Sequence, residues 1–215
     1  MNGSPTVGYE RDVGFRTTLR FVAHSAITAL TRNATTLLAG TGKPKYIVVW
    51  GPPREMETSG RGVVYNYISK MQKENLDIEF YMLTNEQYEY AEHVFQIETG
   101  KSRYTSGSWL STGLFTMVLL RKICDDIVIY GMVDSTYCLQ NPKSMVPYHY
   151  FDPNGVKECA IYLSHEKAKE HGHRFLTEKY IFMSWGLKSY NISFRHPSSS
   201  AKTLDELQKT TFLKT

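Results

Sequence analysis

The sequence predicts an α/β fold with a mainly parallel sheet flanked by helices. Short apolar runs, rich in β-branched and aromatic residues, alternate along the chain with amphipathic segments of helical length. Two of these runs, Tyr46–Trp50 and Ile127–Tyr130, are apolar throughout, as is typical of strands that are covered on both faces of a parallel sheet. The alternation of strand and helix therefore favours a layered α/β sandwich with right-handed crossovers.

The expected elements follow one another through most of the chain. Strands are expected at Leu19–Ala23, Tyr46–Trp50, Ile78–Leu83, Ile127–Tyr130 and Ile192–Phe194. Helices are expected at Ser25–Arg32, Gly62–Glu74, Glu86–Glu98, Gly113–Cys124, Val156–Glu170 and Phe175–Ser189. Gly100 stands where a helix-ending glycine is expected. The serine-containing tail that follows Pro197 is expected to be poorly ordered.

Length and composition indicate one globular domain. A chain of 215 residues is long enough to bury a core, and 41% hydrophobic and 21% charged residues are typical of a folded protein. The net charge is +4, and basic and acidic residues are interspersed. Because no stripe of lysine and arginine is present, nucleic acid is not expected as the main partner.

Targeting signals give two conflicting indications. No apolar run reaches the roughly 18 to 20 residues of a membrane helix, and the first residues do not resemble a signal peptide. Read literally, these features indicate a cytosolic chain. Three Asn-x-Ser/Thr sequons, at Asn2, Asn33 and Asn191, instead suggest N-glycosylation, for which Asn33 and Asn191 are the candidate sites.

The three cysteines allow two interpretations. Cys138 and Cys159 flank a loop that contains two prolines, and a disulfide between them would contribute about 3 kcal/mol in the chain-entropy model. Alternatively, all three cysteines are buried free thiols in a reducing compartment. The residues alone favour neither interpretation, and Cys124 has no partner in the first.

Glycines and hydroxyl groups at the ends of elements are candidates for ligand binding. Ser111 or Thr112 can cap the helix that begins at Gly113, and the first N–H groups of that helix can face an anion, although capping alone is the commoner role. Gly51 and Gly131 follow strands, where α/β proteins bind ligands, but for either glycine alone a simple turn role is the commoner one. The chain contains no Walker loop, no GxGxxG or GxSxG motif and no metal-holding DxD motif.

Two of the seven histidines are candidates for proton transfer. His149 lies among aromatic residues just after a proline, where a loop can fix its ring. His173 precedes Glu178, which is expected to lie about one helical turn on and to orient the imidazole. Imidazole suits acid–base chemistry because it titrates near neutral pH.

The other histidines near His173 do not form a metal motif. His165 and His171 lie close to Glu166 and Glu170, but their spacing lacks the second histidine of HExxH. A solvated helix face is therefore the expected position of His165 and His171, and no metal is expected.

Four ordered segments together resemble the motifs of the animal sialyltransferases, most closely the α-2,6-sialyltransferases that act on N-acetylgalactosamine. The start of the chain, MNGSPTVGYERDVGFRTT, is similar to the second half of the family's large motif. Residues 106–133, with LSTG and CDDIVIYGM, resemble the small motif. Residues 148–152 (YHYFD) and 173–178 (HRFLTE) resemble the third and the very small motif. The resemblance covers nearly the whole chain.

The resemblance implies a GT-A-like variant fold with a Rossmann-type sheet and an inverting transfer of sialic acid from CMP-sialic acid. The transfer would need no metal and no cofactor beyond this donor. His173 would be the general base, and His149 would hydrogen-bond the departing phosphate. The donor would be held by residues of the large, small and third motifs: Asn2, Ser111, Thr112, Gly113, Gly131, Met132 and Tyr148.

The subgroup implies an acceptor and a compartment. Stretches such as ETGKSRYTSGSWLSTG and VPYHYFDPNGVKEC point to the O-6 hydroxyl of N-acetylgalactosamine in a sialylated Gal–GalNAc unit, on a glycoprotein or a glycolipid. The resemblance also implies that Cys138 pairs with Cys159 in the Golgi lumen.

The resemblance further implies that the large motif begins upstream of residue 1, with a cysteine that would pair with Cys124. A membrane anchor and stem would also precede the chain, so the parent would be a type II Golgi membrane protein. Residues 1–197 would then be a catalytic domain that lacks its N-terminal part, and residues 198–215 a tail. The alternative is a truncated, catalytically inactive product that acts at most as a binding protein.

Overall fold

The structure, a computed structural model, describes residues 1–39, 42–133, 135–188 and 191–195. It is a mixed α/β fold with small parallel sheets, which confirms the predicted class at this level. The chain divides into two compact units, Met1–Tyr90 and a second that starts at Ala91, and the boundary falls inside helix α6 (Asn85–Thr99). The tail predicted for residues 198–215 lies outside the described residues.

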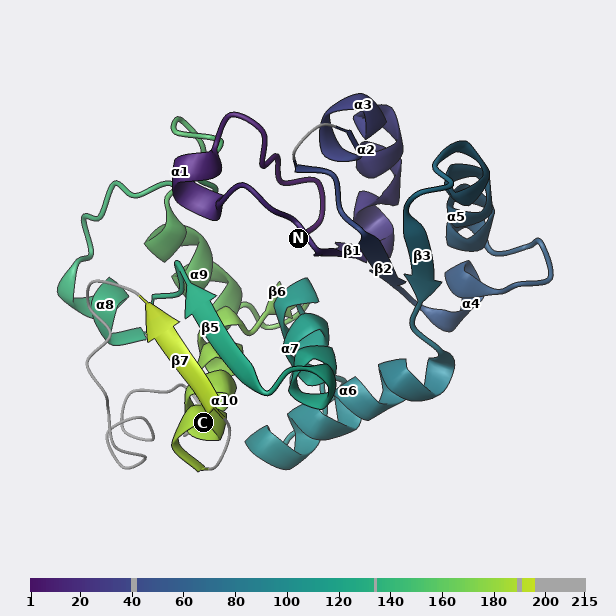
Figure 1. Cartoon of the computed structure of the whole chain (residues 1–215). Coiled ribbons are helices and arrows are strands. Elements are labelled where there is room, and N and C mark those ends of the chain that lie inside the picture. The colour runs from purple at the N-terminus through teal and green to yellow at the C-terminus, as the bar shows by residue number, and fades with distance from the viewer. Residues whose placement is uncertain (40–41, 134, 189–190, 196–215) are drawn as a thin grey trace. The chain divides into compact units, whose positions relative to one another are not determined.

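The first unit contains a three-stranded parallel sheet with the order β1-β2-β3 (Figure 1). Its strands are β1 (Leu19–Ala23), β2 (Tyr46–Trp50) and β3 (Glu79–Met82). The first two match the predicted bounds, and β3 is shorter than the expected Ile78–Leu83. The last four residues of β2 are all buried, so this strand is covered on both faces as its apolar run predicts.

Helices bury an apolar stripe against this sheet. The first unit contains α1 (Glu10–Val13), the 3₁₀ turn η1 (His24–Ala26), α2 (Ile27–Arg32), α3 (Ala34–Leu37), α4 (Pro53–Met56) and α5 (Val63–Glu74). Val64, Ile68 and Met71 of α5 recur at helical spacing and join one core with Ile47 and Val49 of β2. The helix predicted at Ser25–Arg32 is confirmed as α2, although its first residues belong to the 3₁₀ turn η1.

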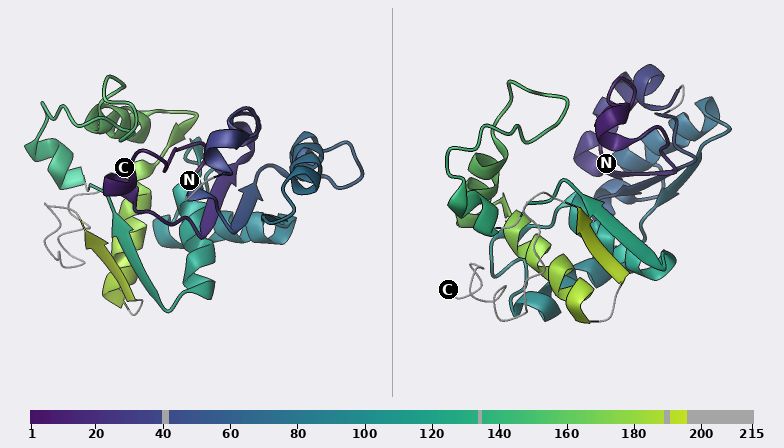
Figure 2. Two further views of the ribbon diagram at one scale, coloured as in Figure 1. Left: turned by 45° about the horizontal axis from the view of Figure 1, so that its top comes forward. Right: turned by 60° about the vertical axis from the view of Figure 1, so that its left-hand side comes forward.

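The described part of the second unit contains two short parallel ladders and four further helices. The strands are β4 (Ser108–Trp109), β5 (Asp126–Tyr130), β6 (Gly172–His173) and β7 (Asn191–Arg195), and the helices are α7 (Thr112–Ile123), α8 (Ser135–Gln140), α9 (Glu158–Lys167) and α10 (Phe175–Lys188). β4 pairs with β6, and β5 lies beside β7 (Figures 1 and 2). Strands of two residues are too short to show a period in the sequence, which is why β4 and β6 are not predicted.

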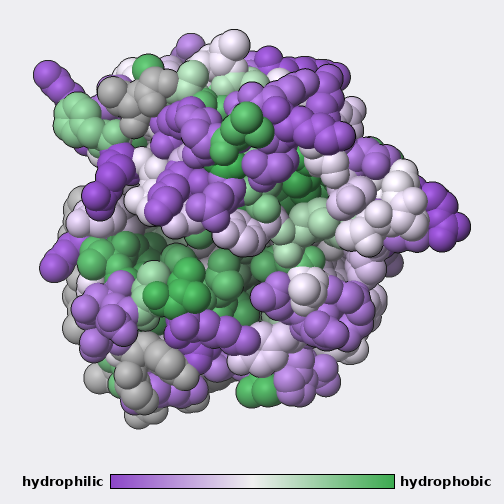
Figure 3. Space-filling model, turned by 45° about the vertical axis from the view of Figure 1, so that its right-hand side comes forward, coloured by the Kyte–Doolittle hydropathy of each residue, from purple (hydrophilic) through white to green (hydrophobic). Residues whose placement is uncertain are grey.

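Strand β5 corrects one prediction. Its apolar run predicts burial on both faces, but Val128 and Tyr130 are 46% and 72% exposed, while Ile127 is buried. In the described residues β5 pairs with β7 alone, and one face of this two-stranded ladder stays open. Elsewhere too, hydrophobic residues reach the surface: on the face drawn in Figure 3 they form patches between hydrophilic ones.

A disulfide connects two helices of the second unit. Cys138 of α8 and Cys159 of α9 are bonded, with their Cα atoms 5.2 Å apart. Both are buried in a cluster with Val133 and Leu176. The pairing agrees with the one that the resemblance implies, and it excludes three buried free thiols. Cys124 is an exposed free thiol in this chain.

No helix within the described ranges combines the length and the apolar character that crossing a bilayer requires.

We expect the disulfide to stabilise the second unit substantially. Replacing Cys138 and Cys159 together by alanine should lower the free energy of unfolding by about 3 kcal/mol, because the unfolded chain loses a cross-link. Urea unfolding followed by circular dichroism measures this loss. Cys124→Ala is the matched control and should unfold like the wild type, since its thiol is exposed and unbonded. Equal midpoints for the double variant and the control would contradict the prediction.

Candidate active site

His173 is fixed by the backbone of the neighbouring strand. It ends β6 and lies opposite Trp109 in the parallel register of β4 and β6. Its Nδ1 is 2.9 Å from the carbonyl oxygen of Trp109. Because a carbonyl can only accept, Nδ1 must carry the proton and Nε2 keeps a lone pair. The ring is partly exposed, so Nε2 is suited to act as a base.

The surroundings of His173 favour its neutral form. Burial lowers the pKa of this imidazole below its usual 6.5, and the bond to the Trp109 carbonyl only partly opposes this. The backbone N–H of His173 donates to Nδ1 of His165 over 3.1 Å, and the two rings stack with centroids 5.7 Å apart. The expectation of a solvated face for His165 is therefore wrong, because the strand brings His173 back against α9. His171 is exposed, as expected.

Glu178 binds a different partner from the one expected. The Ser111 N–H donates to its Oε1 over 2.8 Å, and the Ser111 hydroxyl bonds its Oε2. The prediction that Glu178 orients His173 assumes one continuous helix. Since α10 begins only at Phe175, helical spacing does not relate the two residues, and the Trp109 carbonyl orients the imidazole instead.

The same bonds hold the turn that the resemblance assigns to the donor. Ser111 caps α7, and its Oγ accepts the N–H of Leu114 over 3.2 Å. Thr112 and Gly113 are the first residues of this helix, where backbone N–H groups can face an anion. The capping role predicted for this turn is present, and Glu178 fixes the cap from α10.

Two buried carboxyl groups stand at the start of α10. Glu178 is fully buried, and this burial, with a smaller contribution from nearby Glu166, raises its pKa to about 8 despite the bonds from Ser111. Glu166 accepts the N–H groups of Leu176 and Thr177 over 3.0 and 3.4 Å and thereby caps α10. With a pKa of about 8, Glu178 keeps its proton at neutral pH.

A row of aromatic rings links the two candidate histidines. The ring of His149, an exposed residue, has its centroid 4.5 Å from that of Tyr148. It stacks on the Phe151 ring, with the two centroids 4.8 Å apart. The Tyr148 and Phe175 rings have centroids 6.0 Å apart, and the Phe175 and His173 rings have centroids 5.1 Å apart. Partial burial lowers the pKa of His149, against the opposing effect of a nearby carboxylate. The structure therefore brings both histidines and Tyr148 into one cluster.

The segment after β5 is held by a residue for which the sequence gives no signal. Gly131 has φ +71°, a conformation that suits glycine, and Met132 follows it. The carbonyl of the next residue, Val133, accepts from Nζ of Lys179 over 2.6 Å. Lys179 is buried, with its ammonium 3.6 Å from the centre of the Tyr162 ring. Lys179 and Glu178, adjacent in α10, thus fix two different predicted donor segments.

Asn2 belongs to the first unit, whereas the other predicted donor and catalytic residues belong to the second. Its N–H donates to the Phe21 carbonyl over 2.7 Å, and its Oδ1 accepts the N–H of Ala23 over 2.8 Å. The buried Arg20 donates to the carbonyls of Asn2 and Ser4, both over 2.9 Å. Asn2 is thereby held at the carboxyl end of β1, where parallel sheets bind ligands.

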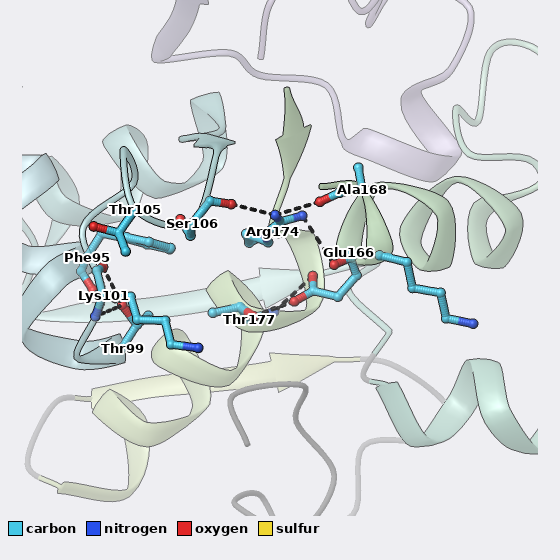
Figure 4. A pocket seen from close by; sticks show the side chains of 10 residues that line it. Phe95, Thr99, Lys101, Thr105, Ser106, Glu166, Ala168, Arg174 and Thr177 are labelled. Atoms are coloured by element: carbon cyan, nitrogen blue, oxygen red, sulfur yellow. Dashed lines mark hydrogen bonds between the residues drawn. The ribbon is translucent and has the colours of Figure 1, made fainter. Parts of the chain in front are cut away.

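Arg174 is a positioning residue that the sequence analysis does not single out. Its guanidinium donates to the carbonyls of His165, Ala168 and Ser106, each over 2.7 Å. Figure 4 draws the bonds to Ser106 and Ala168. It thereby ties the end of α9 to the segment before β4. Its only sequence signal is its place directly after His173 in the HRFLTE motif.

A pocket of about 450 Å³ lies on the Arg174 side of this network (Figure 4). Thr99, Lys101, Thr105 and Lys167 are among its lining residues. Neither candidate histidine lines it, and the groups that could hold a metal do not cluster anywhere in the described part of the chain.

The two candidate glycosylation sites are both accessible. Asn33 lies between α2 and α3, and Asn191 begins β7; both residues are exposed.

Comparison with known proteins identifies the family. The model of glycosyltransferase family 29 (sialyltransferase) matches residues 1–184. The chain belongs to this family. It is 42% identical over 198 residues to an α-N-acetyl-neuraminyl-2,3-β-galactosyl-1,3-N-acetylgalactosaminide α-2,6-sialyltransferase of Homo sapiens, with 92% of the chain and 65% of the relative covered.

Other family 29 members are similarly close. An α-N-acetylgalactosaminide α-2,6-sialyltransferase 3 of Mus musculus is 42% identical, with 92% of the chain and 64% of the relative covered. A sialyltransferase 6 of the same acceptor class from Mus musculus is 40% identical, with 92% and 59% covered. The chain thus spans less than two thirds of the length of these relatives. No solved structure matches it significantly.

The buried Glu178 of this family 29 chain should make its stability depend on pH. Between the ordinary carboxyl pKa of 4.5 and about 8, folded Glu178 keeps a proton that the unfolded chain has released. The contribution of Glu178 to stability should therefore fall as the pH rises through this window. Glu178→Gln removes the titration, so the free energy of unfolding of the wild type minus that of the variant should fall with pH.

Urea unfolding of both proteins across this pH window measures the difference. Glu170→Gln is the matched control, because Glu170 is exposed and its loss should leave the pH dependence unchanged. If the Glu178→Gln and wild-type curves ran parallel throughout, Glu178 would not carry the buried proton.

Proposed function

We propose that this chain is the catalytic part of an inverting α-2,6-sialyltransferase. It would move sialic acid from CMP-sialic acid to the 6-hydroxyl of N-acetylgalactosamine in sialylated Gal–GalNAc glycans. The observation that carries the proposal is His173: its Nδ1 is tied to a carbonyl, its Nε2 keeps a lone pair, and a row of rings leads from it to His149. The linkage and the acceptor rest on the names of the relatives.

His173 acts as the base in this proposal. As the acceptor oxygen attacks C2 of the sialic acid, its proton passes to Nε2 of His173. The bond from C2 to the phosphate oxygen of CMP breaks on the opposite face, and the configuration inverts. The lowered pKa of His173 keeps Nε2 free at neutral pH. An alcohol needs this base because a neutral hydroxyl is a weak nucleophile, and its proton must leave as the new bond forms.

His149 acts on the departing CMP. Both electrons of the breaking bond remain on the phosphate oxygen, so negative charge develops there. Because its pKa is lowered, His149 is neutral at neutral pH, and an N–H of the neutral ring donates a hydrogen bond to that oxygen. Stacking on Phe151 and a tilted contact with Tyr148 fix the ring plane from which this N–H points.

The donor-binding residues in this proposal are those that the sialyltransferase motifs contribute. Ser111, Thr112 and Gly113 offer the N-terminus of α7 to the phosphate, and Asn2 is held at the end of β1 in the first unit. Gly131, Met132 and Tyr148 would line the nucleotide. The proposal includes no metal and no further cofactor, and it assigns the whole catalytic domain a GT-A-like variant of a Rossmann-type fold.

We place the activity in the Golgi lumen, in a parent protein with an N-terminal membrane anchor. The disulfide Cys138–Cys159 supports an oxidising compartment, and the exposed sequons at Asn33 and Asn191 fit a glycosylated protein. The acceptor would be carried on a glycoprotein or a glycolipid.

Removing the base should abolish most transfer. His173→Ala should lower kcat by roughly 10² to 10⁴, the usual worth of general-base catalysis, while CMP still binds. CMP release from CMP-sialic acid with a sialylated Gal–GalNAc acceptor measures kcat, and calorimetric titration with CMP measures the donor site. His93→Ala is the matched control, since His93 is an exposed histidine of α6. Full activity of His173→Ala would show that another group is the base.

Removing the leaving-group donor should have a different signature. His149→Ala should lower kcat by about 10² to 10³, because one hydrogen bond to developing charge is lost. His149→Gln keeps an N–H donor and should recover part of that loss. The assignment would be wrong if both variants had the wild-type kcat with CMP-sialic acid. It would also be wrong if glutamine were no better than alanine.

A further inference from the structure

Trp109 is the exposed tryptophan of the chain. It is 51% exposed, whereas Trp50 and Trp185 are 8% and 1% exposed. Its ring centroid lies 6.2 Å from that of His173 and 5.0 Å from that of His171. Burying an indole is favourable, so a half-open indole directly beside the proposed base is a candidate ligand surface.

The backbone and the side chain of Trp109 have separable roles. Its carbonyl fixes the tautomer of His173, as described above. In the parallel register of β4 and β6, Trp109 and His173 are paired, so their side chains emerge on the same face of the ladder. A change of the indole leaves the carbonyl in place, and the ring contributes contact area next to the base.

We propose that the Trp109 indole is the stacking platform for the acceptor sugar ring that carries the reacting hydroxyl. This inference rests on the proposed transferase function. The C–H-rich face of a pyranose packs on an aromatic face, and a sugar seated there presents its rim to His173. A primary hydroxyl projects from the rim on an exocyclic carbon and reaches the imidazole more readily than a ring hydroxyl. The platform thus favours attack by a 6-hydroxyl.

The ring contacts of Trp109 are separate from those that lead to His149. The proposed leaving-group donor His149 is reached from His173 through Phe175 and Tyr148. Trp109 contacts His173 and His171, and no ring contact among the described residues joins it to Tyr148 or His149. A glycan on Trp109 and a departing phosphate at His149 would then contact different rings of the site.

Kinetics of two variants test the platform. Trp109→Leu should raise the acceptor KM on the order of ten-fold, the effect of losing an aromatic stacking contact. The KM for CMP-sialic acid and the acid limb of the pH profile should stay unchanged, because the Trp109 carbonyl still holds His173. Trp109→Phe keeps an aromatic face and should keep most of the affinity. Tyr104→Ala, which removes another exposed ring of the second unit, should leave the acceptor KM unchanged.

Fluorescence tests binding without turnover. Because Trp50 and Trp185 are buried, the acrylamide-quenchable emission of the wild type comes mainly from Trp109. With CMP bound, a sialylated Gal–GalNAc oligosaccharide should shield that emission saturably. The Trp109→Leu variant should show little quenchable emission.

The outcomes separate the inference from the function. A wild-type acceptor KM in Trp109→Leu, or no shielding by the oligosaccharide, would overturn the platform while transfer by the wild type upheld the transferase. A shifted acid limb in Trp109→Leu would show that the indole acts through His173 and would also overturn it. A wild-type chain that neither transfers nor binds CMP would overturn the proposed function and this inference with it.

Discussion

The contact on which the candidate site depends is the buried bond between Glu178 and Ser111. A carboxyl group without solvent must satisfy its oxygens internally, and both bond to Ser111. That residue is also the cap of α7, so one buried group determines where the proposed phosphate-binding turn lies. Because Glu178 keeps its proton at neutral pH, the contact avoids the large cost of a buried unpaired charge.

The first turn of α10 extends this control to the rest of the site. Phe175 touches both His173 and Tyr148, and Lys179 holds the carbonyl that follows Gly131 and Met132. Three segments far apart in the sequence therefore take their positions from one helix start, which Glu166 in turn caps. This explains physically why a short motif such as HRFLTE carries so much of the site: it contains the base and the helix start that arranges its neighbours.

The elements with a periodic apolar pattern can be predicted from the sequence, whereas features that depend on single long-range contacts cannot. Periodic burial predicts β1, β2 and α5 because each presents several apolar residues to a core. Two-residue strands show no period, and β5 reads as fully covered because composition does not reveal which neighbours a strand has. The histidines could be singled out by their chemistry. The partners of Glu178 and the roles of Lys179 and Arg174 could not, because they depend on where distant carbonyls and amides meet.

Burial moves the two key ionisable groups of the site in opposite directions, and the proposed chemistry needs both. Desolvation disfavours charge, so it lowers the pKa of an imidazole and raises that of a carboxyl. His173 is thereby left neutral and able to accept a proton, while Glu178 is left protonated and able to remain buried. A more open site would let Glu178 ionise, and water would compete with Ser111 for the carboxylate oxygens. The same exclusion of water thus supplies the base and fixes the donor turn, so the two cannot be optimised independently.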